Sequence, residues 1–302
     1  MRQPRPSTAL PLTRRHLLKG ALLALPMATS LRAFAGAGAP EPVAALAELE
    51  RLHGGRLGVY VLDTGTGARF AHRPDERFAM CSTFKLLLSG FVLARADRGE
   101  DKLDRALDVP TTGLVSNSPV TTKRAGTRMT LAELCHATMT TSDNTAANLL
   151  LSAVGGPPAV TAFARSLGDS VTRLDRIEPE LNVVNLKEGD TRDTTTPAAM
   201  ASLLRELVAG DALRPASRDI LIRWMREAAT GLGRLRAGLP ADWNAGDKTG
   251  TGMDGPTNDI AVGWPPGKGP VIVTAYYDRG GHSMAENSVV LAEVGRIVGG
   301  LV

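Results

Sequence analysis

Cys-Ser-Thr-Phe-Lys at residues 81–85 opens an apolar run that continues to residue 94, long enough for a buried helix. Ser82 and Lys85 are three residues apart, so on a helix they share one face. The N-terminal end of a helix also offers free backbone N–H groups and a positive dipole. A hydroxyl, a neighbouring amine and an anion-stabilising backbone are the groups that acyl transfer requires.

Taken alone, this Ser-x-x-Lys pattern is a weak signal. A serine at a helix start is usually a cap, and a lysine one turn later is usually a solvated charge. The catalytic interpretation therefore depends on the rest of the chain.

Three further motifs follow in order. Ser142-Asp143-Asn144 is in a predicted turn, Glu178-Pro179-Glu180-Leu181-Asn182 is in a polar, irregular stretch, and Lys248-Thr249-Gly250 is on a predicted strand. The four-residue spacing from Glu178 to Asn182 places both side chains on one face of a helical turn. Without the other motifs, Glu178 would be interpreted as an exposed loop carboxylate. The joint occurrence and order of the motifs make coincidence a poor explanation.

The hydrophobic pattern changes along the chain. Helical periodicity is predicted for residues 42–53, and again for most of residues 82–224, including 130–138, 145–154, 158–167, 196–210 and 217–227. Thr196-Pro197 predicts an N-cap followed by proline at the first helical position. Strands are predicted at 56–63, 68–72, 244–251, 259–264 and 271–277, and a last helix at 284–298.

This order predicts an α/β plus all-α fold. An antiparallel sheet flanked by helices is built from both termini (residues 36–79 and 225–302), and a helical domain (residues 80–224) is inserted into it, with the active site at the junction.

The first 35 residues are typical of an export signal. They contain six Lys or Arg and no acid; Arg14-Arg15 precede a modest apolar segment, and Ala33-Phe34-Ala35 fits a cleavage site. This pattern resembles a twin-arginine signal peptide, which predicts recognition by the Tat export machinery, cleavage near Ala35 and a periplasmic location. The alternative is an amphipathic or disordered basic tail. The apolar segment is too short and too interrupted for a membrane anchor.

The charge, histidines and cysteines exclude several classes of protein. Without residues 1–35 the net charge is −2, so nucleic acid is not an expected partner. The five histidines form no His-x-His or His-x-x-x-His cluster, so no metal or other cofactor is expected. Cys81 and Cys135 are expected to be free, buried thiols, and a monomer is the default oligomeric state.

The four motifs together resemble the class A serine β-lactamase family, and the resemblance covers residues 42–302. It implies hydrolysis of the β-lactam amide of penicillins and cephalosporins, and hence antibiotic resistance. Ser82 would form an acyl-enzyme, with Lys85 accepting or relaying its proton, and the backbone N–H groups of Ser82 and Thr251 would form the oxyanion hole. Ser142 would pass a proton to the leaving nitrogen, and Glu178 would activate the deacylating water.

The resemblance also implies residues that bind the substrate and support the site. Asn182 would help to hold the water, and Asn144 would bond the substrate side-chain amide. Lys248, Thr249 and Thr251 would recognise the substrate carboxylate, while Asp143 would be a buried structural acceptor. Arg176 and Asp193 match a pair that pins the loop bearing Glu178, and the Glu178–Pro179 bond would be cis.

This chain departs from the family pattern at several positions. Many members supply a carboxylate-binding arginine from the strand after Lys-Thr-Gly, but residues 256–259 read Pro-Thr-Asn-Asp. Arg234 lies at the position from which another subgroup of the family supplies the carboxylate-binding arginine. The alternative interpretation is that Arg234 is a solvated arginine of a helix or loop. Asn117 replaces a usual aromatic, and the segment from Asn182 to Asp193 is longer than the pattern. Gly252 stands where carbapenem-hydrolysing members often have a cysteine, so broad carbapenem hydrolysis is not expected.

Two other activities use the same serine. A penicillin-binding sensor would acylate and stall, and a D,D-peptidase would act on peptidoglycan. Neither requires a deacylation glutamate, so Glu178 together with Asn182 favours the hydrolase.

Overall fold

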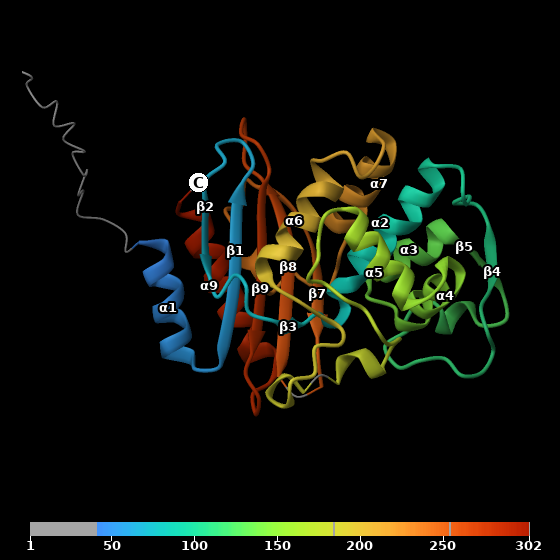
Figure 1. The fold of residues 1–302 in the computed structure, drawn as a ribbon, viewed down its shortest axis with the longest axis horizontal. Coiled ribbons are helices and arrows are strands. Elements are labelled where there is room, and N and C mark those ends of the chain that lie inside the picture. The colour runs from blue at the N-terminus through green and yellow to red at the C-terminus, as the bar shows by residue number, and fades with distance from the viewer. Residues whose placement is uncertain (1–40, 184, 254, 302) are drawn as a thin grey trace, which may run out of the picture. The chain divides into compact units, whose positions relative to one another are not determined.

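The central element is a five-stranded antiparallel sheet with the order β2-β1-β9-β8-β7 (Figure 1). The computed structural model describes residues 41–183, 185–253 and 255–301. The sheet strands are β1 (Arg56–Asp63), β2 (Arg69–His72), β7 (Asn244–Thr251), β8 (Pro256–Trp264) and β9 (Val271–Asp278). β1 pairs with β9 over its whole length, so strands from the two ends of the sequence are neighbours.

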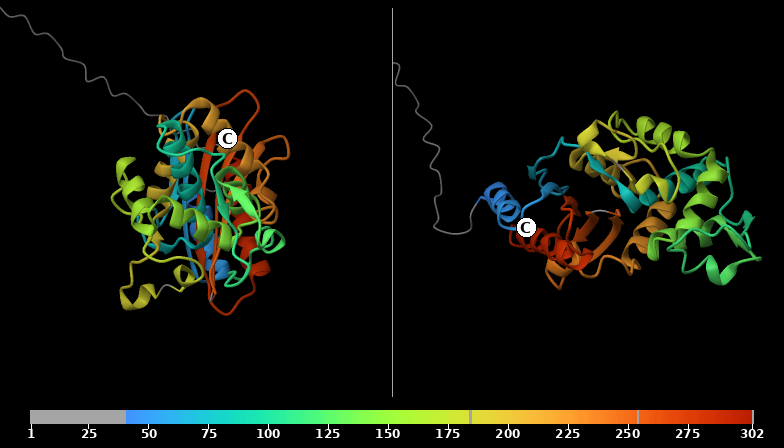
Figure 2. Two further views of the ribbon diagram at one scale, coloured as in Figure 1. Left: turned by 90° about the vertical axis from the view of Figure 1, so that its right-hand side faces the viewer. Right: turned by 90° about the horizontal axis from the view of Figure 1, so that it is seen from below.

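Helices cover both faces of this sheet (Figures 1 and 2). Val273 and Tyr277 of β9 pack with α1 (Pro42–His53) and α9 (Met284–Gly299). Their neighbour Tyr276 faces the opposite side and joins the core formed by the other helices. Because side chains alternate along a strand, a strand buried on both faces is apolar at nearly every position, as β9 is.

The helical part is built around α2 (Phe84–Asp97), whose residues 84–94 are all buried. A helix that is apolar on every side must be enclosed by others, and α2 contacts α3, α4, α5 and α7. The helices of this part are α3 (Leu131–Thr140), α4 (Asn144–Val154), α5 (Pro157–Ser166), α6 (Pro197–Val208) and α7 (Pro215–Arg226).

Side-chain caps fix where several helices begin. Thr130 forms a capping box with Glu133 at the start of α3, and Asp143 caps α4 by accepting from the Ala146 N–H. The predicted Thr196-Pro197 start of α6 is confirmed, because the Thr196 hydroxyl accepts from the backbone N–H of Ala199.

The predicted fold class is confirmed, and some element boundaries are corrected. β8 begins at Pro256 rather than 259, because its first residues pair with the end of β7, and β2 begins at Arg69 rather than 68. Hydrophobic periodicity also missed very short strands whose pairing depends on distant partners: β3 (Phe78–Ala79), β4 (Ala106–Asp108), β5 (Arg128–Thr130) and β6 (Thr194–Thr195). The division at residues 79/80 and 224/225 stays a prediction.

The predicted signal peptide and its cleavage site lie outside the described residues. Within the described part of the chain, no single helix has the length and apolarity to cross a membrane, although the bent pair α4 and α5 would meet those criteria jointly.

The central position of α2 leads to a stability prediction. Leu88 is fully buried in α2, whereas Leu52 of α1 is 64% exposed. Leu88→Ala should lower the free energy of unfolding by about 3 kcal/mol, because it leaves a cavity that the packed core cannot fill. Urea unfolding of residues 36–302 would measure this change. The matched variant Leu52→Ala should change the free energy of unfolding by less than about 0.5 kcal/mol, and equal losses for both variants would contradict the packing described here.

Candidate active site

The nucleophile candidate Ser82 lies in a single 3₁₀ turn, Cys81–Thr83, directly before α2. The expectation that Ser82 itself begins the α-helix is therefore corrected. Cys81 has a left-handed backbone with φ of 45°, which bends the chain sharply ahead of the serine. The three-residue spacing still brings the side chains together, since Lys85 Nζ donates to Ser82 Oγ at 2.9 Å.

The Lys85 ammonium is the common partner of the candidate catalytic groups. Its Nζ is 2.8 Å from the Ser142 carbonyl oxygen, 2.5 Å from Asn144 Oδ1 and 2.9 Å from Glu178 Oε1. Lys85 has no exposed surface, and burial lowers its pKa, while the negative charge of Glu178 acts in the opposite direction. Lys85 Nζ therefore donates hydrogen bonds to groups on both sides of it, next to the Ser82 hydroxyl.

Glu178 also contacts the serine directly. Ser82 Oγ donates to Glu178 Oε1 at 3.2 Å, and Asn182 Nδ2 donates to Glu178 Oε2 at 2.6 Å. Glu178 is 1% exposed, so it is not a solvated loop carboxylate. Asn148 of α4 brackets its backbone, donating to the Glu178 carbonyl and accepting from the Glu178 N–H. The peptide bond between Glu178 and Pro179 is cis, as expected.

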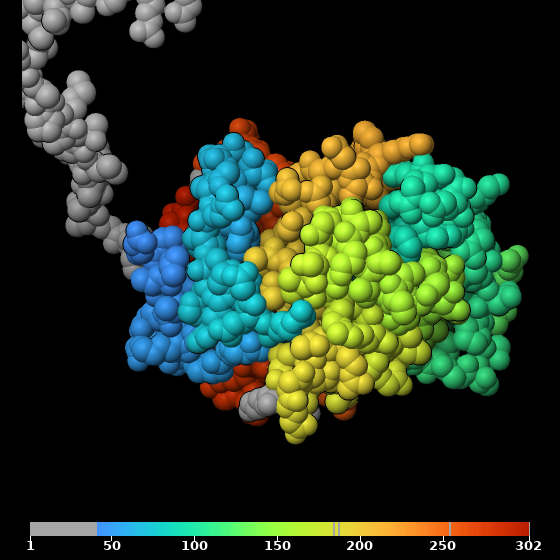
Figure 3. Space-filling model, in the orientation of Figure 1, coloured from blue at the N-terminus to red at the C-terminus, as the bar shows by residue number. Residues whose placement is uncertain are grey.

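A buried ion pair closes the loop that carries Glu178. Arg176 Nε lies 2.5 Å from Asp193 Oδ2. The other oxygen of Asp193 accepts from the backbone N–H groups of Asp175 and Arg176. Asp193 is fully buried and joins the two ends of the loop, much of which lies on the outside of the molecule, in yellow in Figure 3. The predicted pair is therefore formed, and it fixes the base of the loop.

Ser142-Asp143-Asn144 connects α3 to α4, with Asn144 already in α4 rather than in the predicted turn. Ser142 adopts a left-handed conformation with φ of 60° and directs its hydroxyl toward two lysines. Asp143 has no exposed surface and accepts from the Thr121 hydroxyl and from the backbone N–H groups of Thr121 and Ala146. This bonding pattern fits a structural acceptor.

Lys248 projects from β7 into the same cluster. Its Nζ donates to Ser142 Oγ at 3.1 Å and to the Thr249 carbonyl at 2.8 Å. Burial, reinforced by the neighbouring charge of Lys85, lowers the pKa of Lys248 to about 7. The Thr249 hydroxyl lies 2.7 Å from that of Thr230, and both residues line the cavity, so this wall of the site presents hydroxyl groups.

Arg234 reaches the site from the start of α8 (Leu235–Gly238). Its guanidinium donates to Thr251 Oγ1 at 2.7 Å and to the carbonyl oxygens of Gly250 and Asn258 at 2.9 and 2.6 Å. At 3% exposure, the alternative interpretation as a solvated arginine is wrong. Arg234 thus supplies a positive charge beside Thr251, although the strand after Lys-Thr-Gly has none.

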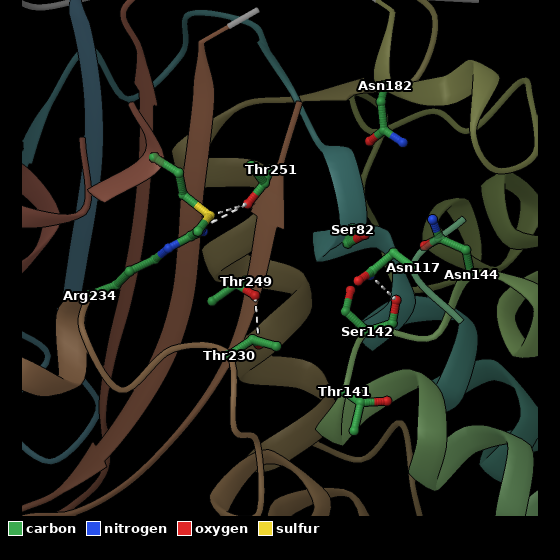
Figure 4. A pocket seen from close by; sticks show the side chains of 11 residues that line it. Ser82, Asn117, Thr141, Ser142, Asn144, Asn182, Thr230, Arg234, Thr249 and Thr251 are labelled. Carbon is green, nitrogen blue, oxygen red and sulfur yellow. Dashed lines mark hydrogen bonds between the residues drawn. The ribbon is translucent and has the colours of Figure 1, made fainter. Parts of the chain in front are cut away.

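These groups surround a cavity of about 450 Å³, a size typical of small-molecule sites. In Figure 4, Arg234, Thr249 and Thr251 lie on the side of the sheet edge, and Ser142 and Asn144 lie opposite them, with Ser82 between. Lys85 and Glu178 do not line the cavity; both are buried and contact Ser82. The lining residues are Ser82, Asn117, Thr141, Ser142, Asn144, Asn182, Thr230, Arg234, Thr249, Thr251 and Met284.

Sequence reasoning missed five residues of the site, one of which is Thr141, directly before Ser142 in the cavity wall. Asn148 lies in the predicted helix 145–154 without an assigned role, and its signal is an amide directly before the apolar residues Leu149–Leu151. Thr230 and Met284 line the cavity from segments far from any motif, and Asn258 holds Arg234 only through its backbone carbonyl. Backbone carbonyls carry no sequence signature, so the contact between Asn258 and Arg234 can be recognised only in the tertiary structure.

The two cysteines are free and buried, as predicted. Burial raises the pKa of both thiols. Within residues 41–183, 185–253 and 255–301, no three His, Cys, Asp or Glu side chains form a group able to hold a metal ion.

Comparison with known proteins agrees with this geometry. The model of the Beta-lactamase enzyme family matches residues 41–301. Beta-lactamase L2 of Stenotrophomonas maltophilia is 49% identical over 286 residues, which cover 93% of this chain and 94% of the relative. Beta-lactamase CTX-M-8 of Citrobacter amalonaticus is 46% identical, with 84% of this chain and 86% of the relative covered.

Solved structures lead to the same family. The Ancestral (GNCA) Beta-lactamase class A is 60% identical with a TM-score of 0.83, covering 85% of this chain and 98% of that one. The Putative Class A Beta-Lactamase PenP from Rhodopseudomonas palustris is 54% identical with a TM-score of 0.83, covering 86% and 99%. Ser82 lines the cavity and contacts the buried Lys85 and Glu178, and together with these comparisons this places the chain in the class A β-lactamase family, to which it belongs.

Proposed function

We propose that this protein hydrolyses the β-lactam amide of penicillins and cephalosporins and thereby confers antibiotic resistance. One observation carries the proposal: the Ser82 hydroxyl contacts both Lys85 Nζ and Glu178 Oε1 at the base of a cavity. The names of relatives covering most of the chain support the same reaction.

Acylation would begin at the Ser82 hydroxyl. As its oxygen adds to the lactam carbonyl carbon, its proton passes to the Lys85–Glu178 pair, and the backbone N–H groups of Ser82 and Thr251 stabilise the oxyanion. The C–N bond then breaks, and Ser142, hydrogen-bonded to Lys248, delivers a proton to the ring nitrogen. Lys85, 3.3 Å from Ser142 Oγ, passes the proton taken from Ser82 on to Ser142 and so restores its hydroxyl. The product of this step is a Ser82 ester.

Deacylation would depend on Glu178. Its carboxylate takes a proton from a water that adds to the ester carbon, while Asn182, already bonded to Glu178, helps to hold that water. Breaking the ester bond returns the proton to Ser82. A sensor or D,D-peptidase lacks this requirement, so a buried glutamate in contact with the nucleophile favours turnover over stalling.

The substrate carboxylate would bind between Lys248, Thr249, Thr251 and Arg234. The Arg234 guanidinium, the Lys248 amine and two hydroxyl groups can all donate hydrogen bonds to a carboxylate, and charge-assisted hydrogen bonds are the strong ones. Asn144 would bond the side-chain amide at the opposite wall, and the amide of Asn117, in place of an aromatic, makes that wall more polar.

The decisive experiment is hydrolysis of a chromogenic cephalosporin by purified residues 36–302, with the intact mass recorded in parallel. Turnover without a lasting adduct is the expected result. A stoichiometric gain in mass without turnover would overturn the hydrolase proposal in favour of the sensor or peptidase.

Loss of the deacylating base should trap the intermediate. Glu178→Ala is expected to acylate but to lower kcat by about 10³-fold, because general-base assistance is lost. Mass spectrometry should then show an adduct on Ser82, and the adduct should be absent in Glu178→Ala/Ser82→Ala. The neighbouring exposed Glu180 offers the control Glu180→Ala, which should turn over normally. Normal turnover by Glu178→Ala would refute the assigned role.

Removing the buried arginine should weaken binding of carboxylates. Arg234→Ala should raise KM for benzylpenicillin at least about tenfold, the value of a lost charge-assisted hydrogen bond. It should also slow inactivation by clavulanate-type inhibitors. Steady-state kinetics would compare it with Arg223→Ala, which removes an exposed arginine of α7. If the two variants have the same KM, Arg234 does not bind the carboxylate.

We also propose that the precursor uses the twin-arginine pathway and that the mature enzyme acts in the periplasm as a monomer, without a membrane anchor. The ordered basic, apolar and small-residue segments of residues 1–35 support export. The candidate site is formed by side chains of one chain, which supports the monomer.

Changing the adjacent arginines should block export. In a bacterial host, Arg14→Lys/Arg15→Lys should leave the full-length precursor in the cytoplasm, measured by fractionation and intact mass. The control Arg2→Lys/Arg5→Lys changes the same number of arginines outside the pair and should be processed near Ala35. Normal processing of the first variant would exclude the twin-arginine route.

A further inference from the structure

The β8 segment that lacks the family's usual arginine holds Arg234 instead. The carbonyl oxygen of Asn258 accepts from Arg234 Nη1 at 2.6 Å. The side-chain amide of Asn258 donates to the carbonyl of Ala79 at 2.9 Å, on the chain that leads into the Ser82 turn. One short segment of β8 therefore contacts both the arginine and the backbone that carries the nucleophile.

The next residue, Asp259, acts on the backbone of the arginine. Asp259 is fully buried, and its Oδ2 accepts from the N–H of Leu235 at 3.1 Å. Leu235 directly follows Arg234 and begins α8. The carboxylate thus fixes the peptide bond between Arg234 and Leu235, next to the Cα atom that carries the Arg234 side chain.

This hold matters because α8 spans only residues 235–238. A helix of one turn has no stability of its own, since nucleation fixes several residues for a single hydrogen bond. Its C-terminal end is held by packing on α9: a Cβ at Gly238 would lie 1.8 Å from the Ala292 carbonyl oxygen. Arg236 pairs with Asp247 at 3.0 Å on the middle of the turn. Asp259 holds the N-terminal end of this turn through the Leu235 N–H, and Arg234 directly precedes that residue.

Asp259 is not a direct counter-ion. Within the described part of the chain, Arg234 forms no ion pair with a carboxylate and donates only to two carbonyls and the Thr251 hydroxyl. Asp259 Oδ1 likewise has no partner among the described residues. Burial raises the pKa of Asp259, so the environment opposes its charged form. The positive charge of Arg234 thus stays available to a ligand, while Asp259 supplies a hydrogen bond.

We propose that Asp259 is a positioning residue for substrate recognition: by bonding the Leu235 N–H, it orients Arg234 toward the carboxylate of the β-lactam. This inference rests on the proposed function. It assigns to β8 a supporting role in place of the arginine that other family members place there.

The test compares three variants of residues 36–302 on benzylpenicillin and on its methyl ester, which lacks the carboxylate charge. Asp259→Ala should raise KM for the acid about tenfold, change kcat less than twofold, and leave kcat/KM for the ester unchanged. Asp259→Asn keeps an acceptor for Leu235 and should stay within about threefold of the wild type. Asp97→Ala is the control, because Asp97 also accepts a backbone N–H, that of Arg214, at the far end of α2.

A double-mutant cycle separates positioning from general destabilisation. In the Arg234→Ala background, Asp259→Ala should have no further effect on KM. An equal loss for acid and ester, an unchanged KM, or additive effects in the cycle would overturn the proposal. Loss of the fold in both Asp259→Ala and Asp259→Asn would overturn the proposal and assign Asp259 a purely structural role. Absence of hydrolysis by the wild type would instead refute the proposed function.

Discussion

The buried ammonium of Lys85 is the interaction on which the site depends. It lies within hydrogen-bond distance of groups from the Ser82 turn, the start of α4 and the Glu178 loop. A charge without exposed surface is costly unless it is paired and fully hydrogen-bonded. The three segments must therefore converge on this amine in the native structure, and their convergence brings the Ser82 hydroxyl, the Lys85 amine and the Glu178 carboxylate into contact.

Side-chain hydrogen bonds also hold the backbone of the segments that contact Lys85. Asp143 fixes the turn before α4 through four hydrogen bonds, and Asp193 closes the Glu178 loop by an ion pair and two backbone contacts. Asn148 then locks the backbone of Glu178 itself. At each point a side chain that accepts from backbone N–H groups holds irregular backbone, which gives precise placement without regular secondary structure.

The residues proposed to bind the substrate carboxylate are held in a different way. Lys248 and Thr249 are on a regular strand, but Arg234 comes from a single helical turn that is stabilised by neighbours. Its guanidinium donates three hydrogen bonds to protein acceptors, and none of its partners within the described residues is a carboxylate. These bonds orient the guanidinium, and β8 contributes the carbonyl of Asn258 and the carboxylate of Asp259 to that orientation. In the proposed function, the charge of Arg234 then binds the substrate carboxylate.

The sequence alone determined the fold class and the four motifs, because helical and strand periodicity and the spacing of Ser82 with Lys85 and of Glu178 with Asn182 are local properties. Short strands such as β3 and β6 were not predictable, since their residues become strands only through a partner more than a hundred positions away. The burial of Arg234 and the roles of Asn148, Asn258 and Asp259 were likewise decided by tertiary structure. Their contacts join segments distant in the chain, often through backbone atoms, and such contacts leave no pattern in the amino-acid sequence.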